Sequence, residues 1–509
     1  MPVPRRAGLA LAIAGSAVAG TALPFTAYAE STASTESVAS TESTVLHVDN
    51  GPRSNCSDSG SGTRERPFCT VQAAADVAGP GQTVQLAPGR RFTGQVTVRR
   101  SGEPGRPIVF QGAEPTVHAP DTSVGTRHWA RGSAPAPHAF VFEGVHDVTV
   151  TGLRLDAPQE GVLVKDSTRI AVDHNDVEAG DPVRGGVRAF PAATPSVRIT
   201  GAGSYVTVSR NRISAAPVSG VAVDAGTSGV VVTTNLITGG AGRGVLVTDA
   251  PGTIVVGNTF GRNCWSDLEF AGNSTGSVAE NNILAKRPAP RCGGTPPTAV
   301  PLVVSAGSVR STRVDYNTVV PWGPYAYSWG DTPFATPEAF RAVGQGASDN
   351  AVDPGFAADR EDYTPAAVTG VTDAADPTAL GTLATDLLGA EPADHPRFPG
   401  STAWGYRDRG AIELQDPLRV RLSARHHPRT GHPLNARFAA GYTTGWAPGT
   451  ATLDFGDGSA PRAVDPGYGF VDHDYPAAGT YTATLTAGGP TGPVRTSTAR
   501  VTVGPAPIG

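Results

Sequence analysis

Six charged residues in the middle of the chain have types and spacings that could do chemistry. Two of them are basic, Lys165 and Arg188, and they stand early in a series of short sequence repeats. The other four are carboxylates of later repeats: Asp224, Asp249, Asp267 and Glu269. A basic side chain can remove a proton from carbon if a nearby cation stabilises the negative charge that develops. Carboxylate oxygens are ligands that suit Ca²⁺, so the four acids could hold such a cation.

Together these groups meet the requirements of β-elimination in a uronic-acid polysaccharide. That reaction removes the proton on the carbon next to the sugar carboxylate. Lys165 or Arg188 would be the base, once positive neighbours or burial lower its pKa, which is a harder demand for an arginine. The four carboxylates would bind the Ca²⁺ cofactor. Aromatic side chains that could stack on sugar rings are Trp265, Phe190, Tyr325 and Trp329.

Other interpretations of the same residues stay open. A glycoside hydrolase needs two carboxylates about 5–9.5 Å apart, which Asp224 with Asp249 or Glu269 could supply. The NTD, DD, GHG and RIK motifs of polygalacturonases are absent, so a lyase is favoured over a hydrolase. Alternatively the charges only solvate an exposed face, and the aromatic residues after residue 320 close the end of the fold. The chain would then be a non-catalytic cell-surface or matrix-binding protein.

The residues from 161 to 319 repeat a short pattern that must position these groups. Each repeat has a glycine, an apolar alternation, a turn, a second alternation and an asparagine. The asparagines are Asn175, Asn211, Asn235, Asn258, Asn282 and Asn317, at separations of 36, 24, 23, 24 and 35 residues. Alternation is the two-residue period of a strand, and a period near 24 predicts a solenoid whose coils each add one strand to several parallel sheets. Stacked asparagines could then hydrogen-bond from coil to coil.

Aligning the repeats on their starting glycines predicts which side chains face outward. The first and third positions after the glycine point into the core. The second position stacks Leu163, Arg188, Ala222, Leu246 and Glu269, and the fourth stacks Lys165, Phe190, Asp224, Thr248 and Ala271. One exposed sheet face is therefore expected to carry the basic residues on early coils and the acids on later ones.

The repeat resembles the right-handed parallel β-helix of pectate-lyase-like proteins over roughly residues 45–415. The resemblance implies an all-β chain, and DRGAIELQ (408–415) resembles the last strand of such domains. In β-helix lyases the base is typically lysine or arginine and the cation is often Ca²⁺. The resemblance is specific for the fold and leaves the reaction open.

The N-terminal segments predict an exported protein. Residues 1–29 have two arginines, an apolar run and an Ala-Tyr-Ala cleavage site, which is typical of a signal peptide. Residues 30–44 are a Ser/Thr/Glu-rich leader that we expect to be disordered. In an oxidising compartment the four cysteines are expected to form two local disulfides, Cys56–Cys69 and Cys264–Cys292. A helix over Val71–Ala78, with Thr70 as its N-cap, is expected to cover the open end of the solenoid.

The C-terminal residues 417–504 resemble a polycystic-kidney-disease-type (PKD) domain, an immunoglobulin-like β-sandwich. DFGDGSAP (454–461), HDYPAAGTYTATLTA (473–487) and TSTARVTV (496–503) carry the resemblance. Gly456 and Gly458 would make a tight turn, while Leu453, Phe455 and Leu485 would point into the core. The fold class expected for the whole chain is therefore a β-helix followed by a β-sandwich.

The composition of the chain limits which classes of partner it can bind. Among 509 residues there are 63 glycines and 45 prolines, and the net charge is −5, which excludes a generally basic nucleic-acid surface. No stretch is long and apolar enough to span a membrane. We expect a secreted, extracellular monomer whose partner is a polysaccharide.

Overall fold

The computed structural model describes the chain from residue 45 onward, with gaps. The described residues are 45–112, 129–131, 138–157, 159–179, 194–214, 218–240, 242–285, 299–321, 323–356, 363–365, 368–396, 398, 406–443, 445–446, 449–465, 467–488 and 494–504. The predicted signal peptide, the predicted leader, Arg188, Phe190 and Cys292 lie outside them.

Within the described residues, strands of three long sheets follow one another in a repeating order. Sheet A contains β1 (Val45–Val48), β2 (Thr83–Leu86), β5 (Ile108–Gly112), β8 (His146–Thr151), β11 (Thr168–Asp173), β14 (Thr207–Ser209), β17 (Val231–Thr233), β20 (Ile254–Val256), β23 (Val278–Glu280) and β26 (Arg313–Asp315). Sheet B contains β3 (Arg91–Thr93), β6 (Trp129–Arg131), β9 (Arg154–Ala157), β12 (Asp176–Ala179), β15 (Arg212–Ser214), β18 (Leu236–Thr238), β21 (Thr259–Gly261), β24 (Ile283–Ala285) and β27 (Thr318–Val320).

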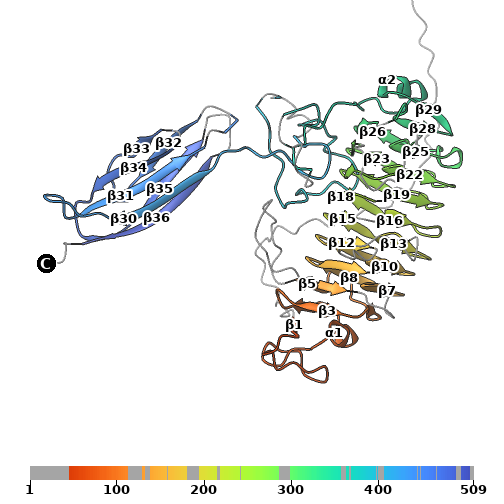
Figure 1. Cartoon of the computed structure of the whole chain (residues 1–509), viewed down its shortest axis with the longest axis horizontal. Coiled ribbons are helices and arrows are strands. Elements are labelled where there is room, and N and C mark those ends of the chain that lie inside the picture. The colour runs from red at the N-terminus through yellow and green to blue at the C-terminus, as the bar shows by residue number, and fades with distance from the viewer. Residues whose placement is uncertain are drawn as a thin grey trace, which may run out of the picture. The chain divides into compact units, whose positions relative to one another are not determined.

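Sheet C supplies the third strand of each coil. It contains β4 (Val96–Val98), β7 (Phe140–Glu143), β10 (Val162–Lys165), β13 (Val197–Thr200), β16 (Ser219–Val223), β19 (Arg243–Thr248), β22 (Leu268–Ala271), β25 (Leu302–Val304), β28 (Tyr327–Trp329) and β29 (Thr332–Phe334). Each strand pairs in parallel with its equivalent on the next coil, except that β29 is antiparallel to β28. This is a parallel β-helix, as predicted, and Figure 1 shows its coils stacked in chain order.

The core follows from the strand alternation. Val162, Val197, Val221, Val245 and Leu268 pair in register down sheet C, and all five are fully buried. Helix α1 (Val71–Val77) covers the first coils, with Val71, Ala74 and Ala75 buried in the same core. Its N-cap is Thr70, whose side chain accepts a hydrogen bond from the Ala73 N–H, as predicted. The Cys56–Cys69 disulfide is present, and Cys264 is also disulfide-bonded.

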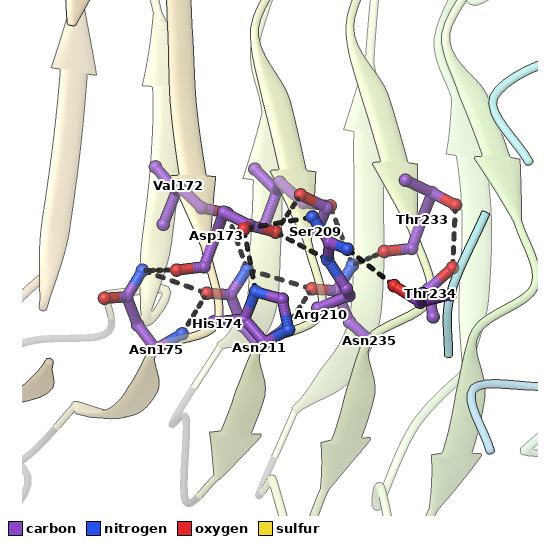
Figure 2. A network of polar contacts seen from close by, with 12 residues as sticks. Val172, Asp173, His174, Asn175, Ser209, Arg210, Asn211, Thr233, Thr234 and Asn235 are labelled. Carbon is purple, nitrogen blue, oxygen red and sulfur yellow. Dashed lines mark hydrogen bonds and ion pairs between the residues drawn. The ribbon is translucent and has the colours of Figure 1, made fainter. Parts of the chain in front are cut away.

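The predicted asparagine column is confirmed. Asn235 illustrates it: its backbone N–H and its Nδ2 both donate to Oδ1 of Asn258, at 2.9 and 3.0 Å, and Nδ2 also donates to the Val208 carbonyl. Figure 2 shows three members side by side, and the same contacts join Asn175, Asn211, Asn235, Asn258, Asn282 and Asn317. The residue before each asparagine has a positive φ, because the chain turns there from sheet A to sheet B; Thr234, at 58°, is one example. The ladder stabilises this otherwise unfavourable conformation.

The C-terminal end of the coils is closed by aromatic side chains. Helix α2 (Pro337–Phe340) places Phe340 against the Tyr327 ring, with centroids 4.1 Å apart. The 3₁₀ turn η2 (Arg341–Val343) follows α2 directly, and the other 3₁₀ turn, η1 (Ala306–Ser308), follows β25. Trp329 pairs with the inward residue Val304 and packs edge-on to Phe340. Trp329 is partly buried against the end of the core, and its predicted contact with substrate stays a prediction.

A long segment without strands, which includes the described residues 368–396 and 406–419, covers parts of sheets A and B. Ala379 packs on Ile254 of β20, and Leu387 packs with Leu236 of β18 and Ile283 of β24. Residues 408–415 belong to this segment and form no strand, so the prediction of a last strand there is wrong. Its backbone makes isolated hydrogen bonds instead: the Gly410 N–H donates to the Asn281 carbonyl, and the Ala411 N–H donates to Thr259 Oγ1.

The remaining strands form two antiparallel sheets that share one core, as an immunoglobulin-like sandwich requires. One sheet contains β30 (Val420–His426), β31 (Asn435–Tyr442) and β34 (Gly467–Asp474); the other contains β32 (Thr450–Asp454), β33 (Arg462–Val464), β35 (Gly479–Gly488) and β36 (Arg495–Val503). Leu453, Phe455 and Leu485 are buried between them, as predicted. Gly456 and Gly458 have φ values of 77° and 83°, which the tight turn requires.

Candidate functional site on the outer face of sheet C

The outer face of sheet C carries the charged residues that the sequence singled out. The outer faces of β18, β20 and β24 are covered by the segment described above, so those parts of sheets A and B cannot bind a ligand. On sheet C, outward positions of β10, β13, β19 and β22 are partly exposed and several are charged, whereas the residues of β16 between them are buried. A solenoid presents such positions as columns, which suits a long polymeric ligand.

Lys165 lies at the end of β10 and is paired with Glu143 of β7. Its Nζ is 3.1 Å from Glu143 Oε1, and both side chains are about half exposed. The hydrogen bond and the charge of Glu143 raise the pKa of Lys165 above its usual value. A lysine that acts as a base needs the opposite shift. The structure therefore gives no support to Lys165 as the proton acceptor.

The predicted position of Arg188 in this sheet is wrong. Sheet C passes directly from β10 to β13, so Leu163 pairs with Arg198, and Arg198 pairs with Ala222. Arg198 takes the place in the column that the sequence alignment gave to Arg188. The side chains of Arg188 and Phe190 lie outside the described residues, and their roles stay predictions.

Arg198 is the centre of the first charged group. Its Nε donates to Asp224 Oδ2 at 2.7 Å, and its Nη1 is 3.8 Å from Glu160 Oε1. Glu160 is 3% exposed, and its Oε2 lies 2.9 Å from His138 Nδ1 without the alignment of a hydrogen bond. The positive charge of Arg198 therefore balances the negative charge of Asp224.

Arg243 is the centre of the second charged group, two coils further on. Its Nε donates to Glu269 Oε2, which also accepts a hydrogen bond from Ser266 Oγ at 2.8 Å. The Arg243 guanidinium lies 5.9 Å from the centre of the Trp265 ring, and the Trp265 side chain is 50% exposed. A fixed arginine beside an exposed indole can bind a sugar carboxylate and a sugar ring together. Tyr325, also predicted to contact substrate, is 37% exposed at the start of the last coil.

The predicted calcium ligands do not come together. Asp249 lies in a turn and accepts the Asn273 N–H, whereas Asp267 is fully buried and accepts from Asn263 Nδ2. Asp224 and Glu269 are paired with different arginines. In the part of the chain that the structure describes, no three potential ligands cluster around one point. These four carboxylates therefore do not fit a Ca²⁺ ion, which needs six or more oxygens.

The residues that sequence reasoning missed stand just before the starting glycines. Glu160 precedes Gly161 and Arg243 precedes Gly244; Ser219, which pairs with Arg243, is buried. The sequence alignment considered only positions after the glycine. Strict alternation would have directed the residue before the glycine into the core; the structure breaks the alternation at Gly244, which the two-residue period alone could not predict.

Comparison with known proteins supports the fold. The model of the family described as the right-handed β-helix region matches residues 138–294. An alginate lyase from Paenibacillus sp. str. FPU-7 is similar at 14% identity and TM-score 0.32, over 48% of this chain and 90% of that one. A rhamnogalacturonan lyase is similar at 13% identity and TM-score 0.37, over 62% and 91% of the two chains.

The pectate lyase Pel9A is also similar, at 16% identity and TM-score 0.32, over 74% of this chain and 98% of that one. At such low identities and TM-scores these similarities do not indicate a reaction for this chain. No curated protein matches it. None of the described helices has the length and hydropathy that a membrane span requires.

Proposed function

We propose that this chain is a secreted carbohydrate-active protein that binds an extracellular acidic polysaccharide across the outer face of sheet C. The observation that carries the proposal is the Arg243 guanidinium, fixed by Glu269 beside the half-exposed Trp265 ring. Arg198 lies two strands away on the same sheet face, in register with Leu246 and not with Arg243, so a sugar chain that crosses the coils obliquely would meet both arginines. Two arginines on one face suit the regularly spaced carboxylates of a uronic-acid polymer.

The first prediction concerns Arg243 and Trp265. We expect Arg243→Ala and Trp265→Ala each to weaken binding of polygalacturonate about tenfold. The first variant loses a contact with a sugar carboxylate and the second a contact with a sugar ring, each worth roughly 1–2 kcal/mol. Isothermal titration of the full chain with polygalacturonate, alginate and a neutral glucan is the measurement. Arg106→Ala is the matched control, because Arg106 is an exposed arginine in a loop, paired with Glu103. Equal binding by all four proteins would refute the proposed site.

Cleavage by β-elimination is the second candidate function, and one contact favours it. The imidazole of His138 lies 2.9 Å from the buried Glu160, which is itself close to Arg198. An imidazole can accept the proton while an arginine stabilises the enolate that forms. Absorbance of unsaturated uronate, measured on pectin, alginate and glycosaminoglycans with and without chelator, tests this. No signal from any substrate would leave a non-catalytic binding protein.

Hydrolysis by Asp224 and Glu269 is less favoured by the geometry. They stand two strands apart, so their Cα atoms are on the order of 12 Å from each other, beyond the usual spacing of hydrolase carboxylates. Each also forms an ion pair with its own arginine.

The second prediction concerns Lys165. We expect Lys165→Met to change polysaccharide binding, and any release of unsaturated uronate, by no more than about twofold, because an exposed ion pair contributes little. The same titration and absorbance assays measure it, with His138→Ala as the comparison for turnover. A hundredfold loss of turnover in Lys165→Met alone would restore this lysine as the base.

A further inference from the structure

The outer face of the three-stranded sheet β30-β31-β34 exposes two large aromatic rings. Phe470 is 69% exposed and Tyr468 is 64% exposed, more than any other aromatic side chain in the described residues. They are separated by one residue on β34, so both rings lie on the same side of the sheet, while Val471 points into the core. Exposed rings of this size on a rigid strand are unfavourable for an isolated domain unless they contact a partner.

Small residues beside these rings keep the surface open. Tyr468 pairs with Gly441 and Phe470 with Ala439 on the neighbouring strand. A Cβ atom on Gly441 would lie 2.7 Å from Tyr468 Cδ2, so the tyrosine ring lies over the glycine backbone. Ser423 continues the row on β30, opposite Ala439. The result is a shallow surface on which a flat ligand can reach both aromatic rings.

Arginines surround the rings. Arg421 and Arg425 of β30 are exposed and face the same side, since they pair with Gly441 and Arg437. Arg437 donates through Nε and Nη2 to Asp472, at 2.8 and 2.9 Å, and its guanidinium lies 5.7 Å from the Phe470 ring. In the described residues, no carboxylate forms an ion pair with Arg421 or Arg425.

The charge of this surface is opposite to that of the whole chain. Four arginines lie on it or at its edge (Arg421, Arg425, Arg429 and Arg437), and Arg429 also contacts Asp472. Two carboxylates lie there, Asp472 and Asp474, and the latter is bound by His432 and Asn435. Four positive charges less two negative ones leave an excess of two, on a chain with a net charge of −5.

We propose that this face, the aromatic–arginine face of the sandwich, is a second binding site for an anionic polysaccharide. Aromatic rings stack on the apolar faces of sugars, and the free guanidinium groups of Arg421 and Arg425 bind their carboxylate or sulfate groups. The site does not depend on the proposed site of sheet C. Two sites on one chain would raise its retention on a polymer well above the affinity of either site.

The test uses the full chain that carries Arg243→Ala and Trp265→Ala, so that only the second site is measured. Its residual affinity for polygalacturonate and for heparin is determined by isothermal titration at two salt concentrations. Adding Tyr468→Ala and Phe470→Ala is expected to lower this affinity about tenfold or more. Arg421→Gln with Arg425→Gln is expected to lower it and to flatten its salt dependence. Thr482→Ala with Thr498→Ala, exposed on the opposite sheet, is the matched control.

The outcomes separate this site from the first. If adding Tyr468→Ala and Phe470→Ala abolishes binding and leaves the unfolding temperature unchanged, the proposal is supported whether or not the sheet C site exists. Unchanged binding in the aromatic variant would overturn it, even if Arg243 and Trp265 matter. Equal affinity for a neutral glucan, or binding only to anionic lipid vesicles, would also overturn it, because the partner would then not be an anionic polysaccharide.

Discussion

Replacing Asn235 with alanine is expected to lower the free energy of unfolding of the β-helix by about 3–6 kcal/mol. Asn235 is fully buried. Its Oδ1 accepts two hydrogen bonds from Asn211, and its Nδ2 donates to Asn258 and to the Val208 carbonyl. Alanine would leave the Asn211 backbone N–H without its partner, while Asn211 Nδ2 and Asn258 Oδ1 would each lose one of their hydrogen bonds. Because Asn211 and Asn258 are fully buried, the lost hydrogen bonds carry a desolvation cost.

The measurement is urea denaturation, and two variants calibrate it. Asn273 is exposed in the turn between β22 and β23, so Asn273→Ala should change stability by less than about 0.5 kcal/mol. Asn175 is the first asparagine of the ladder and accepts from the Leu153 N–H, where the preceding coil has no amide side chain. Asn175→Ala should therefore cost less than Asn235→Ala. If Asn235→Ala costs no more than Asn273→Ala, the ladder does not stabilise the coils.

The fold could be predicted because the same physical requirement recurs on every coil. Alternating valines must fill the same core layer on each coil. An asparagine side chain must form the same hydrogen bonds at the turn that follows. Asn235 and Val221 are 14 residues apart, and so are Asn211 and Val197. This spacing also shows why the position of Arg188 was wrong. Residues 186–190 and 196–200 both alternate, but only the second stretch has the correct distance to its asparagine.

The site was harder to predict because its ion pairs cross from one coil to the next. Arg198 and Asp224 are 26 residues apart, as are Arg243 and Glu269. Each pair depends on the register of neighbouring strands and on the rotamer of a long side chain. Sequence patterns define neither with enough accuracy. The covering of sheets A and B could not be predicted either, because residues 371–412 have no periodicity.

This irregular segment leads to the second large effect, a stability that falls as pH rises. Glu413 and Asp408 are 5% and 3% exposed, and the Asp408 N–H donates to Glu413 Oε2. Burial and the charge of Asp408 raise the pKa of Glu413 well above its usual value. Burial also raises the pKa of Asp408, to about 7, despite hydrogen bonds from the N–H groups of Leu414 and Asp373. Arg407, 3.3 Å from Glu413, offsets only part of this.

The direction of the pH dependence follows from these shifts. A carboxyl group whose folded pKa is raised keeps its proton in the folded protein after the unfolded chain has lost it. The folded state then binds more protons between about pH 4 and pH 7, so stability decreases as pH rises through that window. One such group accounts for about 1.4 kcal/mol per pH unit. We therefore expect the unfolding temperature to fall between pH 5 and pH 7.

Glu413→Gln tests this interpretation, because an amide resembles the protonated acid in shape and cannot ionise. It removes one titrating group and the repulsion with Asp408, so its unfolding temperature should fall less steeply between pH 5 and pH 7. Calorimetry at half-unit pH steps compares it with the unmodified chain and with Glu391→Gln, since Glu391 is exposed in the same segment. The test compares how steeply the unfolding temperature falls with pH, and not its absolute value. The absolute value also changes because Arg407 loses its charged partner in the variant. A variant slope as steep as that of the unmodified chain would show that other groups cause the pH dependence.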